Sequence, residues 1–167
     1  MKHMTQWLIA TGAGVGTLPK TPGTWGSLIP VLLVLICGHF KVSPTWLIGV
    51  LLAIIVVASI ATIVLAPWYT KYYERKDPPQ VVCDEVAGQS IALLGMAWVA
   101  PNNHVPSFQW ILLVLLAFAL FRVFDVWKPF IINNVQQLSA GWGVLADDIL
   151  AGAVAGSIVV LVAGMML

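Results

Sequence analysis

Residues 45–66 read TWLIGVLLAIIVVASIATIVLA, and this stretch decides the fold. It contains no charged side chain, and Pro67 follows directly after it. A helix needs roughly 20 residues to cross about 30 Å of hydrocarbon. The stretch is therefore long and apolar enough to span a membrane as a helix.

The composition of the whole chain also indicates a membrane environment. Of its 167 residues, 60% are hydrophobic and only 9% are charged, whereas an average soluble domain has about 25% charged residues. We therefore expect one membrane-embedded domain over residues 1–167. The net charge of +1 and the lack of a basic run give no indication of nucleic-acid binding. The two cysteines lie far apart in the sequence and suggest neither a disulfide nor a zinc site.

Four further apolar segments bring the predicted number of helices to about five. Val86–Ala100, Gln109–Phe124 and Ile149–Leu167 carry few ionisable side chains. Ser27–Phe40 is short and contains Pro30, so it extends backward, tilts or fails to cross completely. The sequence thus predicts an all-α fold, a polytopic membrane helix bundle of about five transmembrane helices.

If all five segments cross, the charged residues collect on one side of the membrane. That side receives residues 1–26, 67–85 and 122–148, with all seven acidic and seven of the eight basic residues. Lys41 falls on the opposite side. The excess of Lys and Arg predicts that the charged side is cytoplasmic. We therefore expect the functional surface to face the cytoplasm.

Five carboxylates at the predicted helix ends are the main candidates for chemistry: Asp84, Glu85, Asp125, Asp147 and Asp148. One interpretation is helix capping, because an acid at an N-terminus accepts hydrogen bonds from free N–H groups and suits the helix dipole. Capping explains a single acid better than a pair, since the second charge repels the first. The other interpretation is a metal site, because dense carboxylate oxygens suit Mg²⁺.

The two acidic pairs lie in similar surroundings. Val82–Gly88 and Leu145–Gly152 both place the pair before an apolar helix, with small residues following. Gly152 and Gly156 form a small-xxx-small pattern, which is typical of closely packed membrane helices. The similarity is also what two ordinary helix starts would produce.

Two basic residues lie close to one of these acids. Arg122 and Asp125 are three apart and share a helix face if the helix continues that far, and Lys128 follows three residues later. An interfacial belt of long basic side chains beside Trp127 is one interpretation. A clamp for a phosphate group is the other, since Arg and Lys stabilise phosphoryl oxygens.

Residues 12–27 read GAGVGTLPKTPGTWGS and lead into an apolar segment. Such a loop can direct N–H groups toward an anion, and Lys20, Thr24 and Ser27 are candidate phosphate-binding residues within it. The alternative is a loop that only packs over the helix ends. The stretch has neither the GxGxxG pattern of a dinucleotide site nor a Walker A pattern.

The sequence lacks the motifs of other phosphatase mechanisms. Gln89 stands six residues after Cys83, where a cysteine phosphatase needs arginine, and no Asp-x-Asp motif occurs. His3, His39 and His104 do not cluster in the sequence. A histidine-based lipid phosphatase is therefore disfavoured.

Four motifs, in order, resemble the phosphatidylglycerophosphatase A family and cover nearly the whole chain. They are GAGVGTLPKTPGTWGS at 12–27, Lys76-Asp77-Pro78 with VVCDEVAG at 81–88, FRVFDVWKP at 121–129 and GWGVLADDILAG at 141–152. Two departures are visible. Phe130-Ile131-Ile132 stands where the family often has a second proline, and Trp142 stands where a small residue is usual. Neither removes a charged group.

The resemblance implies a Mg²⁺-dependent phosphatase of the bacterial inner membrane. Its lipid substrate would be phosphatidylglycerophosphate, and its products phosphatidylglycerol and inorganic phosphate. The five carboxylates would be the catalytic and metal-binding residues, and Arg122 and Lys128 would bind the substrate phosphate. Mg²⁺ would activate water, with Glu85 as a candidate base, while direct attack by an aspartate stays open.

Three other interpretations remain. A small ion or solute carrier is the first, because carboxylates in membrane proteins often mark ion paths. A carrier should hold its acids near mid-membrane, whereas these lie at predicted helix ends. A structural subunit would use the charges as caps and anchors. A head-group transferase would need an Asp-Gly-x-x-Ala-Arg motif, which the chain lacks.

Overall fold

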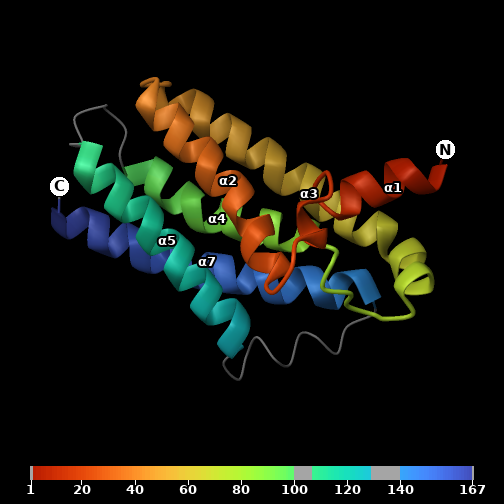
Figure 1. Cartoon of the computed structure of the whole chain (residues 1–167). Coiled ribbons are helices and arrows are strands. Elements are labelled where there is room, and N and C mark those ends of the chain that lie inside the picture. The colour runs from red at the N-terminus through yellow and green to blue at the C-terminus, as the bar shows by residue number, and fades with distance from the viewer. Residues whose placement is uncertain (1, 100–106, 129–139, 167) are drawn as a thin grey trace.

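The structure is a computed structural model that describes residues 2–99, 107–128 and 140–166. Within these ranges the elements are helices, and no β-strand occurs. They are α1 (Lys2–Ala10), the 3₁₀ helix η1 (Val15–Thr17), α2 (Pro22–His39), α3 (Pro44–Tyr73), α4 (Cys83–Val99), α5 (Ser107–Trp127) and α7 (Ala140–Met166). Five long helices form an elongated bundle, and α1 extends from one end of it (Figure 1). The predicted all-α bundle is confirmed.

Four helices of the described part are long and apolar enough to cross a membrane. They are α2, α3, Phe108–Trp127 of α5 and Gly141–Met166 of α7. The segment predicted as Ser27–Phe40 starts earlier, at Pro22, and has 18 residues with Pro30 inside it. The long apolar helices make this a multi-pass membrane protein.

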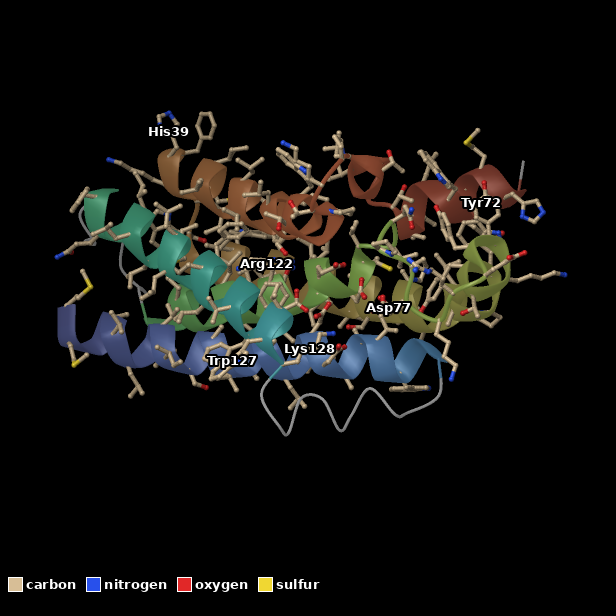
Figure 2. All side chains as sticks on the ribbon, turned by 60° about the horizontal axis from the view of Figure 1, so that its bottom comes forward. His39, Tyr72, Asp77, Arg122, Trp127 and Lys128 are labelled. Carbon is tan, nitrogen blue, oxygen red and sulfur yellow. The ribbon has the colours of Figure 1, made fainter. Side chains whose placement is uncertain are left out.

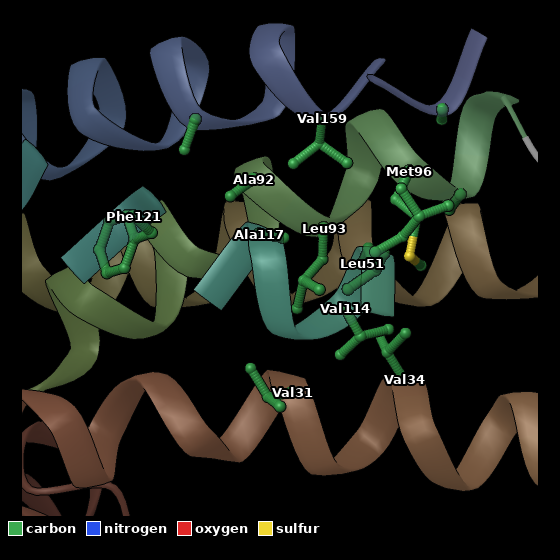
Figure 3. Close-up of a cluster of buried hydrophobic side chains, with 14 of the residues drawn as sticks. Val31, Val34, Leu51, Ala92, Leu93, Met96, Val114, Ala117, Phe121 and Val159 are labelled. Atoms are coloured by element: carbon green, nitrogen blue, oxygen red, sulfur yellow. The ribbon is translucent and has the colours of Figure 1, made fainter. Parts of the chain in front are cut away.

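Helix α4 has 17 residues and lies at the centre of the bundle. It contacts α2, α3, α5 and α7, and none of residues 83–97 is exposed. Leu93 and Met96 of α4 lie in one apolar cluster with Val31 and Val34 of α2 (Figure 3). Because α4 is covered by protein on all sides, its length need not match the thickness of the bilayer.

Glycines bring α4 and α7 into close contact. A Cβ on Gly95 would lie 2.7 Å from the carbonyl oxygen of Gly156, and one on Gly152 would collide with the carbonyl oxygen of Gly88. Such close backbone approach is what small residues permit between membrane helices. The small residues noted at Gly152 and Gly156 therefore pack α7 against α4.

Helix α3 does not end at Pro67, as the sequence suggested, but continues to Tyr73. A proline removes one backbone hydrogen bond and bends a helix, but neighbouring helices can hold it in a membrane bundle. The helix ends at Glu74, whose φ of 54° is left-handed. At 30 residues, α3 is about 45 Å long and exceeds the hydrocarbon thickness.

The start of α7 also differs from the prediction. The helix begins at Ala140 rather than Ile149, so Asp147 and Asp148 lie about two turns inside it. Reading the acidic pair as a helix start was therefore wrong. The two acids face protein rather than lipid, since they are 2% and 3% exposed, and Asp147 forms an ion pair with Lys128.

The Gly/Pro-rich segment before α2 packs over the start of α4. Gly12 and Gly14 have φ angles of 56° and 93°, which glycine adopts without strain. A Cβ on Gly16 would collide with the carbonyl oxygen of Gln80, and the Val82 N–H donates to the Ala10 carbonyl at 2.9 Å. The loop thereby fixes the chain that enters α4.

Candidate active site

Three carboxylates meet where α4 and α7 lie closest. Asp84 and Glu85 lie in the first turn of α4, and Asp148 faces them from α7. One ligand atom from each of these carboxylates lies within 4.8 Å of the other two. Gly88 permits this approach, because a Cβ there would lie 2.5 Å from the Asp148 carbonyl oxygen.

The other two predicted acids border this group. The carboxyl group of Asp125 on α5 is within hydrogen-bond reach of Asp148. Asp147 forms an ion pair with Lys128, and its Oδ1 accepts a hydrogen bond from the Asp148 N–H at 3.2 Å. Carboxylates from α4, α5 and α7, far apart in the sequence, thus come together at one place.

Arg122 reaches from α5 to both the acids and α2. Its Nη1 lies 2.6 Å from Asp125 Oδ2 and 3.5 Å from Ser27 Oγ. A Cβ on Gly23 would collide with the Glu85 carboxylate and lie 3.2 Å from Arg122 Nη1. The missing side chain of Gly23 therefore leaves the space that Glu85 and Arg122 occupy.

Lys128 follows directly after α5 and is the second basic group of the site. Burial alone would lower the pKa of Lys128, but the hydrogen bond to Asp147 and the charges of Asp147 and Asp125 outweigh it and raise that pKa. Lys128 is therefore a cation at neutral pH. Arg122 and Lys128 lie along the same stretch of the bundle, with Asp77 nearby (Figure 2).

Protein groups do not fully satisfy the acids. Asp84 Oδ1 and Glu85 Oε2 are buried and have no hydrogen-bond partner in the described part of the chain. Buried polar atoms without partners are costly, and clustered like charges add to that cost. Carboxylate oxygens are the ligands that Mg²⁺ prefers. The cluster of Asp84, Glu85 and Asp148 could hold a divalent cation.

Helix capping accounts poorly for the same residues. Asp147 and Asp148 lie inside α7 rather than at its start. Asp84 and Glu85 do lie in the first turn of α4, but each leaves a buried oxygen without a partner among the residues described. A cap would direct those oxygens to free N–H groups.

Two of the predicted phosphate-binding residues stand apart from the cluster. Lys20 is exposed and has a left-handed φ of 78°, and Thr24 lies in the first turn of α2. No side-chain hydrogen bond or ion pair joins either residue to the acids within the described ranges. Pro129 and Phe130-Ile131-Ile132 lie outside the described residues.

Sequence reasoning did not assign Gly23 or Asp77 to the site. Asp77 lies in the segment before α4, where the charges of Lys128, Asp147 and Asp125 act on it. Its signal was the Lys76-Asp77-Pro78 motif, which was noted without a role. Gly23 is one of several glycines in the Gly/Pro-rich loop, and nothing in the sequence tells which of them meets a carboxylate.

The sequence pattern of the family described as Phosphatidylglycerophosphatase A matches residues 8–163. The chain belongs to this family. The predicted family is thereby confirmed. Membership of the phosphatidylglycerophosphatase A family supports a phosphatase activity.

Named relatives agree with the family match. A phosphatidylglycerophosphatase A of Haemophilus influenzae is 36% identical over 147 residues, covering 86% of this chain and 80% of the relative. One of Escherichia coli is 31% identical over 161 residues, covering 95% and 84%. A Bacteroides thetaiotaomicron protein named "Putative phosphatidylinositol-3-phosphatase" is 36% identical over 148 residues, covering 87% and 85%. No solved structure matches the chain.

Proposed function

We propose that this protein hydrolyses phosphatidylglycerophosphate to phosphatidylglycerol and inorganic phosphate, with Mg²⁺ as cofactor. It would act as one domain over residues 1–167 in the bacterial inner membrane, with its site facing the cytoplasm. The family supports the phosphatase, and the names of two relatives support this substrate.

One observation carries the proposal. Asp84 and Glu85 on α4 and Asp148 on α7 each have one carboxylate oxygen within 4.8 Å of such an oxygen of the other two, beside Arg122 and Lys128. Acids packed this closely repel one another when ionised, and a cation that joins them removes this repulsion. A phosphate beside the cation would then meet positive charge from the metal and from both basic side chains.

Asp84, Glu85 and Asp148 would hold the ion, with Asp125 and Asp147 at its border. Two of these residues have a buried oxygen without a partner, so the protein offers ligand atoms that are not otherwise engaged. When bound, Mg²⁺ would lower the pKa of a water and offset charge on the phosphoryl oxygens.

The basic residues would bind the substrate phosphate. Arg122 has five N–H donors and Lys128 has three, so each can contact phosphate while keeping its pairing with Asp125 or Asp147. Ser27 lies 3.5 Å from Arg122 Nη1 and would help to direct the guanidinium. Lys20 and Thr24 lie in the preceding loop and first turn of α2, where they would meet the head group as it enters.

The chemical step is attack of water on phosphorus with loss of the lipid oxygen. A carboxylate oxygen of Glu85 that does not contact the ion would accept the proton of the attacking water and pass it to the leaving ester oxygen. The bond between phosphorus and the ester oxygen breaks, and that oxygen leaves with a proton as the hydroxyl of phosphatidylglycerol. An aspartate as the nucleophile is the alternative, and a chirally labelled phosphate ester distinguishes the two: direct attack of water inverts the configuration at phosphorus, whereas two successive displacements through a phosphoaspartate retain it.

The test uses purified full-length protein in detergent with phosphatidylglycerophosphate. Phosphate release should require Mg²⁺ and stop with EDTA, and phosphatidylinositol 3-phosphate should be hydrolysed more slowly. Mn²⁺ binding, followed by electron paramagnetic resonance without substrate, should disappear in Asp148→Asn. A wild-type protein that releases no phosphate from either lipid would refute the proposal.

A matched control is available on the same side of the bundle. Glu74 is exposed, follows the end of α3, and is not one of the clustered carboxylates. Glu74→Gln removes one carboxylate from the chain without touching the site. It should keep wild-type phosphate release and Mn²⁺ binding.

A further inference from the structure

Gln89 is a buried side chain that the proposed chemistry does not use. Its side chain is 0% exposed, and neither Oε1 nor Nε2 has a hydrogen-bond partner among the described residues. A primary amide has two donor hydrogens and an acceptor oxygen. An amide with none of these satisfied is strongly disfavoured inside an apolar bundle.

The position of Gln89 relates it to the carboxylates. Glu85 and Gln89 are four residues apart on α4 and so share a helix face, with Gln89 about 6 Å further into the bundle. Four residues further on, Leu93 belongs to the apolar cluster of Figure 3. Gln89 is therefore the last polar side chain on this stripe before the apolar core.

Helix α2 supplies a second polar group at the same depth. Gly23 of α2 faces Glu85, and Val31 of α2 lies in the same apolar cluster as Leu93. Ser27 lies halfway between Gly23 and Val31, as Gln89 lies halfway between Glu85 and Leu93. Two helices that run in the same direction with this register place Ser27 level with Gln89. The Ser27 hydroxyl donates to the Gly23 carbonyl at 2.8 Å, so its oxygen remains available only as an acceptor.

We propose that Gln89, with Ser27 beside it, binds a hydroxyl group of the lipid head group next to the phosphate. This rests on the proposed function, because the terminal phosphate must lie at the carboxylates. In phosphatidylglycerophosphate the central glycerol hydroxyl is the next polar group along the head group. It can donate to Gln89 Oε1 and accept from Nε2, which satisfies both amide atoms.

Gln89 would thereby determine specificity. A lipid phosphate without this hydroxyl leaves the buried amide unsatisfied, and such a mismatch is rejected more strongly than a missing apolar contact. The catalytic groups are unchanged in either case. The selectivity is thus for head groups that carry a hydroxyl beside the phosphate ester.

The test is a two-by-two comparison of enzyme and substrate. Wild type and Gln89→Met are each assayed with phosphatidylglycerophosphate and with its analogue in which hydrogen replaces the central hydroxyl. Wild type should lose about tenfold in kcat/KM with the analogue. Gln89→Met should have the same kcat/KM with both lipids, and this value should be close to that of wild type with the analogue.

Several outcomes would overturn the inference. Equal rates of wild type on both lipids would refute it without any variant, even if Gln89→Met failed to fold. If Gln89→Met also lost about tenfold in kcat/KM with the analogue, the hydroxyl would be bound by another residue. A wild type inactive on phosphatidylglycerophosphate would instead refute the proposed function, and this inference with it.

Ser90→Ala is the matched control variant. Ser90 is the next residue of α4 and is equally buried, but its hydroxyl already donates to the Val86 carbonyl at 2.7 Å. Its removal should keep the tenfold preference for the lipid with the hydroxyl. A loss of preference in Ser90→Ala would mean that any change in α4 has this effect, and the role assigned to Gln89 would be withdrawn.

Discussion

Gly88 on α4 lies against the backbone carbonyl of Asp148 on α7, with room for hydrogen but not for a methyl group. A Cβ at Gly88 would lie 2.5 Å from that oxygen and 2.6 Å from the ring of Phe121. The contact sets the separation of the two helices that carry the carboxylates. The geometry of the charged groups therefore depends on a residue without a side chain.

Gly88→Ala should separate α4 and α7 and weaken the site. Overpacking of this kind destabilises by about 1–3 kcal/mol, so the thermal midpoint should fall. Phosphate release should drop by at least about tenfold, since small shifts of catalytic groups have large effects. Gly164→Ala is the control, because a Cβ there meets nothing within 4 Å.

Asp84→Asn and Asp148→Asn should each abolish phosphate release, by about 100-fold or more, while the protein still folds. Without metal, their thermal midpoints should equal or exceed that of wild type, because one charge is removed from a group of repelling acids. Thermal unfolding in EDTA checks this. A large loss of stability in EDTA would instead support the capping interpretation.

Asp125→Asn and Asp147→Asn distinguish the role of the two bordering acids from that of the three clustered acids. Each should lose most activity, because Arg122 and Lys128 lose the partners that hold them. Mn²⁺ binding should weaken less than in Asp148→Asn, since these two carboxylates lie at the border. Phosphate release and Mn²⁺ binding are measured on the same preparation of each variant, so the loss of activity can be compared with the loss of binding. Near-normal rates of phosphate release in both variants would contradict the roles assigned to Asp125 and Asp147.

Arg122→Lys should raise KM more than it lowers kcat. Lysine keeps the charge but not the planar set of donors that can contact Asp125 and Ser27 together. We expect about a tenfold fall in kcat/KM. Arg75→Lys is the control, because Arg75 is exposed, and an equal fall there would indicate a nonspecific effect of the substitution.

The orientation can be tested by labelling. After both native cysteines are replaced, a cysteine at Lys76 should react with an impermeant maleimide only from the cytoplasmic side. One at Lys41 should react from the opposite side, because Lys41 follows α2 and Lys76 follows α3. Labelling of both from one side would contradict the proposed topology.

The sequence predicted the helices because apolar length is a strong signal in a membrane protein. The predicted helix ends were inaccurate where a proline or a charged residue was interpreted as a helix boundary. Pro67 is accommodated inside α3, and the acidic pair lies inside α7, where Asp147 forms an ion pair with Lys128. Membrane boundaries and helix boundaries need not coincide.

The candidate site was visible in the sequence as residue types, but its contacts were not. The pair Arg122 and Asp125 follows from helix spacing, and the structure has their ion pair. The pairing of Lys128 with Asp147 joins residues on either side of a long connection, which spacing cannot predict. The sequence does not identify Gly23 as a site residue, because Gly23 acts only through the space that its missing side chain leaves for the Glu85 carboxylate.

The enclosure of α4 has a consequence for biosynthesis. Its flanks are covered by helices made before and after it, and α7, which bears Asp148, is made after α4. A chain released before α7 is made would hold Asp84 and Glu85 without Asp148 and could not assemble the cluster of three carboxylates. Truncated copies in the membrane would therefore be inert, so the cell would gain no unregulated hydrolysis from unfinished protein.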